Sequence, residues 1–200
     1  MEKDNTSWLA TIKEDQRIFS LTHPGQGIFK YLYYPDFRAV FIFRASQLFF
    51  RWRITRPLAY LCTMLNDLLH GVWIGPRVVA GPCLLLGHPR GLVVNPSARI
   101  GRYCSILQRV TIGGPNVTIG DYVSINANAT IISNVRGRAF LNIGDHAIIG
   151  AGAVVVSDVP DCGVIVGVPG RIVKMITPED NWLEFTLRRL ADKKNQHENG

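Results

Sequence analysis

An aliphatic side chain recurs at about every sixth residue from position 74 to position 155 of this chain. Nine of the thirteen residues in the series are isoleucine, and eight of the thirteen are followed directly by glycine. A period of six fits neither an isolated α-helix nor an alternating strand. It is typical of a parallel β-helix, in which each repeat forms one short side of a coil. The series is Ile74, Ala80, Leu86, Val94, Ile100, Ile106, Ile112, Ile119, Ile125, Ile131, Ile143, Ile149 and Val155.

The regular spacing is interrupted three times. Two extra residues fall within 86–94, one extra residue falls within 112–119, and one repeat position is missing within 131–143, where residues 134–138 are expected to form a small loop. Insertions in a solenoid form loops, often on the face that binds a ligand. We therefore expect the functional residues to lie at these interruptions.

Helices are expected on both sides of the repeats. An apolar run over residues 35–53 begins with Pro-Asp, and a second run over 57–70 begins with Pro, which favours the first turn of a helix. The segment 20–34 contains Pro and Gly and is expected to be a loop. The sequence Thr-Pro-Glu-Asp at 177–180 offers capping chemistry for a charged C-terminal helix.

The chain is thus expected to be mainly β and to have three parts. Residues 1–70 form a helical segment, residues 71–173 form the β-helix, and residues 174–200 form a C-terminal helix and a polar tail. A length of 200 residues and a hydrophobic content of 47% suit one compact domain with an accessory segment.

Charge and cysteine content limit the environment of the chain. The formal net charge of +7 favours anions, and by itself it leaves nucleic acid, an anionic membrane face, a phosphorylated cofactor and an acidic glycan open. The four cysteines form no CxxC pair, and Cys104 stands where other repeats have small or aliphatic residues, which predicts a packed thiol. A reducing, cytoplasmic location follows, and the polar N-terminus lacks the apolar core of a signal peptide.

Two apolar stretches are candidates for a membrane span. Residues 39–50 are interrupted by Arg44, and residues 58–69 contain Asp67, so neither reaches the roughly 18 uninterrupted apolar residues of a spanning helix. Arg44 and Arg51 share a helical face with apolar neighbours, which leaves a peripheral membrane contact open. Packing of these helices against a partner subunit is the favoured alternative.

The first interruption contains His88. The motifs around it are His-x-x-Gly at 88–91, Ala-x-Ile-Gly at 98–101, Ser-Ile-Leu-Gln at 105–108, Gly-Gly at 113–114, Ile-Gly-Ala-Gly-Ala at 149–153 and Gly-Val-Pro-Gly-Arg at 167–171. With these motifs the chain resembles the hexapeptide-repeat acyltransferases, and within them the serine acetyltransferase branch. The helical stretch that starts at Phe37 also resembles that branch, so the resemblance covers about 150 residues.

The resemblance implies a left-handed parallel β-helix that assembles as a homotrimer, with acetyl-CoA bound between subunits. It also implies that His88 is the general base for an acceptor hydroxyl. This role is chemically reasonable, because a hydroxyl is a poor nucleophile at neutral pH and imidazole titrates near that range. The reaction requires neither a metal nor a covalent enzyme intermediate. No nucleic-acid partner is expected.

The resemblance also implies a set of cofactor-binding residues. Alanines in this set expose backbone groups to the amides of the cofactor, and basic residues suit its phosphates. Ser157 stands where the family commonly has lysine. The set is Gly113, Gly114, Ala127, Ala151, Ser157, Arg171 and Lys174.

Three departures from the serine acetyltransferase pattern concern the acceptor. Trp73 stands where an aspartate orients the catalytic histidine, and Gly87 replaces an aspartate just before that histidine. The Arg-His pair that handles an amino acid is absent from the short stretch 115–118. We therefore expect a sugar or glycan acceptor, as in capsule and exopolysaccharide O-acetyltransferases. The expected acceptor-binding residues are Trp73, Arg90, Asn95 and Tyr103.

Other functions remain open from sequence. Serine O-acetylation by a divergent site and N-acetylation of an amino sugar use the same scaffold. Zinc-dependent hydration of carbon dioxide needs about three histidine ligands, whereas the repeats contain only His88 and His146. A non-catalytic scaffold is the last alternative.

Overall fold

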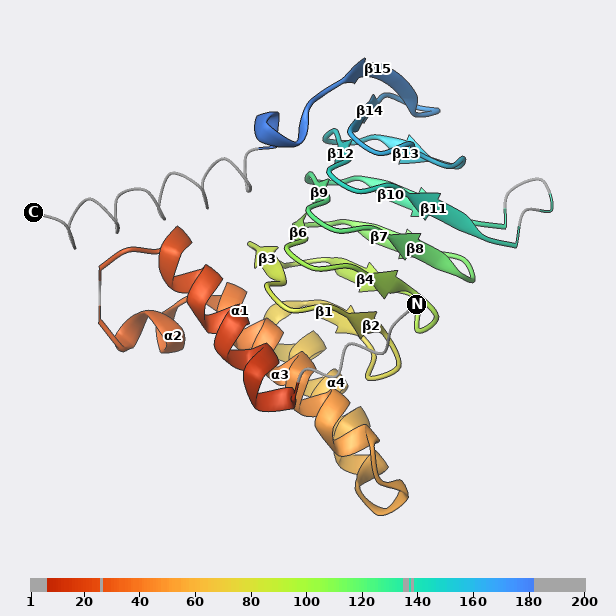
Figure 1. Cartoon of the computed structure of the whole chain (residues 1–200). Coiled ribbons are helices and arrows are strands. Elements are labelled where there is room, and N and C mark those ends of the chain that lie inside the picture. Colours follow the sequence, from red (N-terminus) through yellow and green to blue (C-terminus); the bar gives the residue numbers. More distant parts are fainter. Residues whose placement is uncertain (1–6, 26, 135–136, 138, 182–200) are drawn as a thin grey trace, which may run out of the picture.

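The short strands of this protein coil into a stack of parallel turns, with helices packed against the first turn (Figure 1). The computed structural model describes residues 7–25, 27–134, 137 and 139–181. The strands are β1 (Val72–Ile74), β2 (Val79–Ala80), β3 (Leu85–Gly87), β4 (Leu92–Val94), β5 (Arg99–Ile100), β6 (Ser105–Leu107), β7 (Thr111–Gly113), β8 (Val117–Ile119), β9 (Ser124–Ile125), β10 (Thr130–Ile132), β11 (Leu141–Ile143), β12 (Ile148–Ile149), β13 (Val154–Val155), β14 (Gly163–Val166) and β15 (Arg171–Met175).

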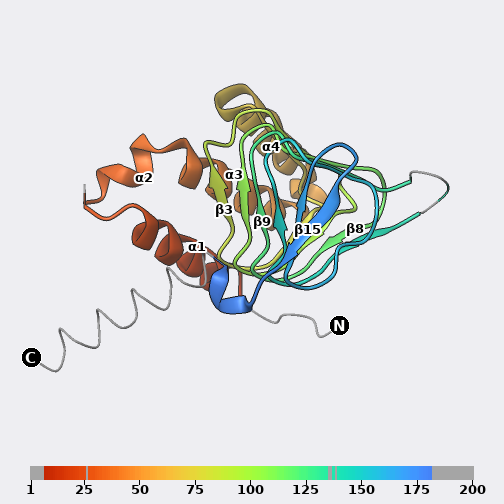
Figure 2. The ribbon, with the colours of Figure 1, turned by 90° about the horizontal axis from the view of Figure 1, so that it is seen from above.

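Successive strands alternate among three sheets. The first sheet has the order β1-β4-β7-β10-β13, the second β11-β8-β5-β2, and the third β15-β14-β12-β9-β6-β3. All pairs are parallel except β14 with β15, which is antiparallel. Seen from above, the coils lie over one another (Figure 2).

The six-residue repeat lies inside this stack. In the first sheet, the register pairs Ile74 with Val94, Val94 with Ile112, and Ile112 with Ile131. The repeat residues are buried, except that Ala80 is partly buried against the same core. Columns of aliphatic side chains thus form the interior that no single coil could bury. The expected fold class, a mainly β protein with a left-handed parallel β-helix after N-terminal helices, is confirmed; the expected C-terminal helix reaches into residues 182–200, outside the described residues.

Contacts between coils explain why glycine so often follows the aliphatic residue. A Cβ on Gly120 would collide with the carboxylate of Asp145 and with backbone of the next coil. Asp145 uses that same carboxylate to accept a hydrogen bond from the backbone N–H of Asp121 at 2.7 Å. Two further pairs share this close approach: Gly101 with Asp121, and Gly144 with Asp161.

This packing predicts the effect of one methyl group. Gly120→Ala should destabilise the fold by about 1–3 kcal/mol, because the coil must shift to accommodate the added atom. Gly75→Ala is the matched control, since Gly75 also follows a repeat residue but has no atom within 4 Å of the added Cβ. Urea unfolding followed by circular dichroism measures both. Equal stability of the two variants would contradict this account of the glycines.

The helices are α1 (Trp8–Thr22), α2 (Phe29–Tyr33), α3 (Pro35–Phe50), the short 3₁₀ helix η1 (Arg53–Thr55) and α4 (Arg56–His70). The two helices expected over 35–53 and 57–70 are therefore present, with their ends shifted by a few residues. The expected loop 20–34 is partly wrong, because α1 continues to Thr22 and α2 forms one further turn. The Pro and Gly residues of this segment lie in the short connection between α1 and α2.

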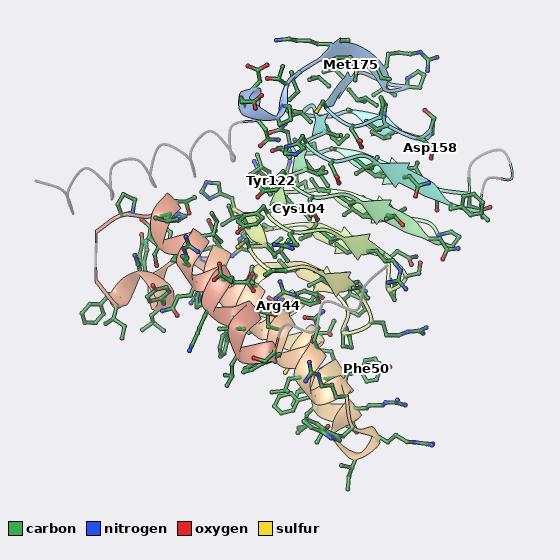
Figure 3. All side chains as sticks on the ribbon, viewed as in Figure 1. Arg44, Phe50, Cys104, Tyr122, Asp158 and Met175 are labelled. Atoms are coloured by element: carbon green, nitrogen blue, oxygen red, sulfur yellow. The ribbon has the colours of Figure 1, made fainter. Side chains whose placement is uncertain are left out.

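A buried ion pair attaches the helices to the first coil. Arg44 on α3 donates from Nε to Oδ2 of Asp15 on α1 at 2.8 Å, and both side chains are 2% exposed. The Arg44 guanidinium also donates to the carbonyls of Ala80 at 2.7 Å and Gly81 at 2.6 Å, while Asp15 accepts from the Leu84 N–H at 3.0 Å. Figure 3 places Arg44 between the helices and the coil.

This position corrects one expectation about Arg44. The helical pattern grouped Arg44 with Arg51 on a face open to a membrane, but Arg44 is 1% exposed and ion-paired. Removing one member of such a pair leaves an uncompensated buried charge, at a cost of about 3–5 kcal/mol. Arg44 therefore holds the helices in place and is not available to lipid. None of the described helices is long and apolar enough to cross a membrane.

Helix α4 buries its smaller and more polar side chains. Ala59, Thr63, Asn66 and His70 are buried, and Asn66 donates to the Ala39 carbonyl of α3 at 3.0 Å. The opposite face exposes large apolar side chains: Leu58, Leu61, Met64, Leu65, Leu68 and Leu69. This arrangement leaves an apolar helix face that no other described residue covers.

The C-terminal end of the described chain covers the last coil. β15 pairs with β14, and the 3₁₀ helix η3 (Pro178–Asp180) follows. A capping box joins Thr177 and Asp180, as the sequence led us to expect. Asn181 donates from its side chain to the Tyr122 carbonyl at 2.8 Å, which attaches this end to the side of the stack.

Candidate functional site

His88 lies in the turn between β3 and β4, where the first interruption adds residues to the coil. Its backbone has φ of 49°, a left-handed conformation that is uncommon for residues other than glycine. The His88 carbonyl accepts from the Arg90 N–H at 2.7 Å, and the Gly91 N–H donates to the carbonyl of Gly71 at 2.8 Å. The turn that presents His88 is therefore fixed to the junction between α4 and β1.

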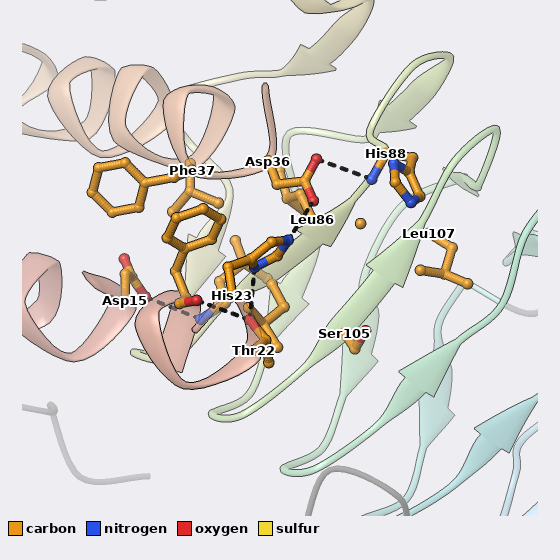
Figure 4. Close-up of a pocket in the computed structure, with 14 residues that line it drawn as sticks. Asp15, Thr22, His23, Asp36, Phe37, Leu86, His88, Ser105 and Leu107 are labelled. Carbon is orange, nitrogen blue, oxygen red and sulfur yellow. Dashed lines mark hydrogen bonds and ion pairs between the residues drawn. The ribbon is translucent and has the colours of Figure 1, made fainter. Parts of the chain in front are cut away.

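A carboxylate from the helices meets this turn. Asp36, in the first turn of α3, accepts from the backbone N–H of His88 at 3.2 Å (Figure 4). Its other oxygen lies 3.9 Å from Nε2 of His23, which follows α1. Burial raises the pKa of Asp36 above its usual range, and the neighbouring His88 and His23 oppose that rise.

Two pockets meet at His88. The first, here called the helix-side pocket, lies between the helices and the third sheet. Its lining is Asp15, Phe19, Thr22, His23, Asp36, Phe37, Val40, Leu84, Leu85, Leu86, Gly87, His88, Ser105 and Leu107. The second, here called the corner pocket, lies where the third sheet turns into the first. Its lining is Pro35, His88, Pro89, Arg90, Gln108, Arg109 and Asn128.

The corner pocket lies at one end of a row of hydrogen-bonded turns, one from each coil, that runs along the stack. The Arg109 N–H donates to the Arg90 carbonyl at 2.9 Å, the Asn128 N–H to the Gln108 carbonyl at 3.0 Å, and the Gly152 N–H to the Ala127 carbonyl at 2.9 Å. Ala127 and Ala151 therefore occupy the same corner as His88, on successive coils. The structure brings these two expected cofactor residues and Arg90 into line with the expected base.

Other expected residues lie elsewhere. Gly113, Gly114, Asn95 and Ser157 lie where the first sheet ends, at a different corner from His88. The Asn95 side chain accepts from the backbone N–H of Ser97 at 3.0 Å, so it stabilises its own turn. None of these residues lines either pocket within the described chain.

The two aromatic residues expected to bind the acceptor also lie away from His88. Tyr103 lies at the third corner, where its ring stacks on that of Tyr122 with centroids 4.7 Å apart. Trp73 is 47% exposed on β1, beside Val93 of β4. Neither lines a pocket that contains His88. The basic residues Arg171 and Lys174 lie on exposed β15, at the far edge of the third sheet from β3.

Sequence reasoning did not identify Asp36, His23, Arg109 or Asn128 as site residues. In the sequence, Asp36 marks the start of a helix, which is the usual reason for an acidic residue at that position. His23 lies in a segment expected to be a loop. Arg109 and Asn128 could have been found only by aligning the repeats so that positions 90, 109 and 128 stack at one corner.

The two buried thiols and the metal-ligand residue types give no further site among the described residues. Cys104 is buried, as expected, and burial raises its pKa to about 12. Burial likewise raises the pKa of Cys83 to about 12. Neither thiol is therefore activated as a nucleophile. The described residues contain no group of three or more His, Cys, Asp and Glu side chains that could hold a metal ion.

The fold and the His88 turn together define a hexapeptide-repeat acyltransferase. The serine acetyltransferase of Synechococcus elongatus is 33% identical to this chain over 172 residues, which are 82% of this chain and 68% of that protein. A crystal structure of Neisseria gonorrhoeae serine acetyltransferase in complex with serine matches with a TM-score of 0.73 and 34% identity, over 85% of this chain and 70% of that chain. This chain belongs to the serine acetyltransferase family.

A third comparison concerns the cofactor. A serine acetyltransferase solved in complex with CoA matches with a TM-score of 0.73 and 29% identity, over 84% of this chain and 70% of that chain. No family model matches the chain. Because these relatives are serine acetyltransferases, the expected closer relation to capsule and exopolysaccharide enzymes is not supported by them.

Proposed function

We propose that this chain is an acetyl-CoA-dependent O-acetyltransferase in which His88 is the general base. The observation that carries the proposal is that His88 lines both pockets. One pocket can then admit the acceptor hydroxyl and the other the thioester, with the imidazole between them. A base must lie within hydrogen-bond reach of the proton it removes, and this position allows that.

The chemistry balances with His88 as the only proton carrier. The imidazole takes the hydroxyl proton as the oxygen attacks the thioester carbon, and a tetrahedral oxyanion forms. The carbon–sulfur bond then breaks, and the imidazolium returns the proton to the departing thiolate of CoA. The products are the acetyl ester and free CoA, and His88 is neutral again.

The residues stacked at the His88 corner on successive coils support the placement of acetyl-CoA along that corner. Ala127 and Ala151 have small side chains, which leave room for the pantetheine arm to lie along the backbone. Arg90 and Arg109 supply positive charge at the corner pocket, and Arg171 and Lys174 supply it farther along the stack. Guanidinium and ammonium groups suit the cofactor's phosphates.

Serine is the acceptor that the comparisons favour. The relatives described above are serine acetyltransferases, and one was solved with serine bound. The sugar acceptor expected from the sequence has less support from these relatives. Serine O-acetylation is therefore the first candidate reaction.

A sugar hydroxyl remains the second candidate because of the helix-side pocket. That pocket is lined by no lysine or arginine, and it contains the carboxylates Asp15 and Asp36. An amino acid's carboxylate needs a cationic partner, which a neutral sugar does not. The short 115–118 turn, which lacks Arg and His, also favours the sugar.

Replacement of His88 tests the reaction. His88→Gln should reduce kcat for acetyl transfer by about 100- to 10,000-fold, the usual contribution of a general base. Replacement of His146, which lies in the repeats but lines neither pocket, by Gln is the matched control and should leave kcat unchanged. Release of CoA thiol measures turnover. A His88→Gln variant as active as the wild type would contradict the role of the base.

A competition between acceptors separates the two candidate reactions. The purified protein is supplied with acetyl-CoA and with serine, a neutral hexose, a sugar nucleotide or an amino-sugar nucleotide in turn, and the acetylated product is identified by mass spectrometry. We expect serine to give the highest kcat/KM. A sugar product with no turnover of serine would replace the first candidate by the second.

We infer that the site is completed in a homotrimer. The expected residues lie at different corners of the stack, so a single chain does not gather them around His88. The exposed apolar face of α4 and the exposed side chains of Trp73 and Val93 offer surface for contacts between copies. Contiguous exposed apolar surface of this kind often marks a protein interface.

Charge placed on the α4 face tests the assembly. Leu61→Glu combined with Leu65→Glu should convert the trimer to monomers, because the interface would have to bury carboxylates. Leu9→Glu on α1, at a leucine that is 63% exposed, is the matched control. Light scattering after size exclusion measures the mass. A monomeric wild type would contradict the trimer, and a trimeric double variant would remove α4 from the interface.

A further inference from the structure

We propose that Asp36 is the positioning residue of His88, and that His23 completes a chain His88–Asp36–His23 between the helices and the coil. The proposal rests on the proposed function of His88 as a base. It concerns the carboxylate that the sequence left unassigned, since Trp73 and Gly87 occupy the places where this family would supply one. Here the carboxylate comes from α3.

The backbone contact is the first support. His88 adopts a left-handed φ of 49°. This conformation costs a residue other than glycine free energy, which contacts with its surroundings must offset. Asp36 accepts from the His88 N–H at 3.2 Å, while the Arg90 N–H donates to the His88 carbonyl at 2.7 Å. Both polar backbone groups of His88 are thus held, one by α3 and one by the turn itself.

The charge of Asp36 is the second support. Its side chain is 9% exposed, and the guanidinium of Arg44 is already paired with Asp15. The titratable groups beside Asp36 are then His88 from the coil and His23 from the end of α1. A buried carboxylate favours the protonated form of a nearby imidazole. Asp36 would therefore stabilise His88 at the moment when it holds the acceptor's proton.

His23 is fixed so that its Nε2 faces Asp36. Its ring stacks on Phe19 with centroids 4.4 Å apart and lies 4.6 Å from the Tyr34 ring. Its Nδ1 lies 3.1 Å from the Thr22 hydroxyl, which leaves Nε2 at 3.9 Å from Oδ2 of Asp36. Figure 4 shows the three side chains in sequence, with Asp36 in the middle. His23 thereby orients the carboxylate that holds His88.

The charge of Asp36 is unfavourable in the folded state. Burial raises its pKa, so the folded state binds a proton more tightly than the unfolded chain does. For a carboxyl of this kind, the stability of the fold decreases as the pH rises from the unfolded pKa to the folded pKa. The charge of Asp36 at neutral pH therefore opposes folding. Asp36→Asn should be no less stable than the wild type at pH 7.

The test separates charge from structure. Asp36→Asn keeps an oxygen that can accept from the His88 N–H and removes only the charge. We expect kcat/KM to fall by about 10- to 100-fold, with KM for acetyl-CoA unchanged and the acidic limb of the pH profile moved to lower pH. Glu179→Gln makes the same carboxylate-to-amide change on exposed η3, away from His88 and from α4, and should alter none of these quantities.

A second measurement does not depend on activity. The pH midpoint of the His88 ring signals in the NMR spectrum should move to lower pH in Asp36→Asn and stay constant in Glu179→Gln. In a double-mutant cycle, His23→Ala should cost little further activity once Asp36 is replaced by Ala, because members of one chain are not additive.

The outcomes are distinct. An unmoved His88 midpoint in Asp36→Asn overturns the positioning role, whatever the activity. A moved midpoint in a protein that transfers no acetyl group to any acceptor would uphold the juxtaposition and overturn the proposed function. Additive losses for His23 and Asp36 would remove His23 from the chain.

Discussion

The buried ion pair between Arg44 and Asp15 holds the helices of this protein against its β-helix. The pair is nearly inaccessible to water, and such a pair is stable only when its remaining polar atoms find partners. The carbonyls of Ala80 and Gly81 and the N–H of Leu84 supply those partners from the corner between β2 and β3. The first coil therefore takes part in the ion pair, and α1 and α3 cannot move independently of it.

This attachment decides what surrounds His88. Asp36 lies about two helical turns before Arg44 on α3, so the position of Arg44 also fixes Asp36 beside the His88 turn. The coil supplies the base and the backbone row with Ala127 and Ala151, while the helices supply carboxylate and imidazole. The candidate site thus combines residues from the coil with residues from the helices, and the ion pair sets the distance between coil and helices.

The repeat residues and His88 could be predicted because both are local signals. A column such as Ile74–Val94–Ile112 follows from the spacing alone, since any chain with this period must stack its aliphatic residues to bury them. Arg44 and Asp36 could not be predicted, because an amphipathic pattern does not say whether a charged residue meets solvent or a buried partner. Asp36 and His88 are separated by 52 positions along the chain. Tyr103 and Trp73 are expected near His88 because their rings offer stacking surface for a sugar, but Tyr103 lies at another corner and Trp73 lies on the first sheet.

The sequence by itself determined the β-helix, the helices before it, the turn that carries His88 and the resemblance to the serine acetyltransferases. Each of these depends on spacing, on Pro and Gly positions, or on contiguous motifs. Only the tertiary structure decided which carboxylate meets His88, which expected residues share its corner, and that α4 turns its large apolar side chains outward. Those features depend on how the helices pack on the first coil, and the packing is set by hydrogen bonds between residues far apart in the chain.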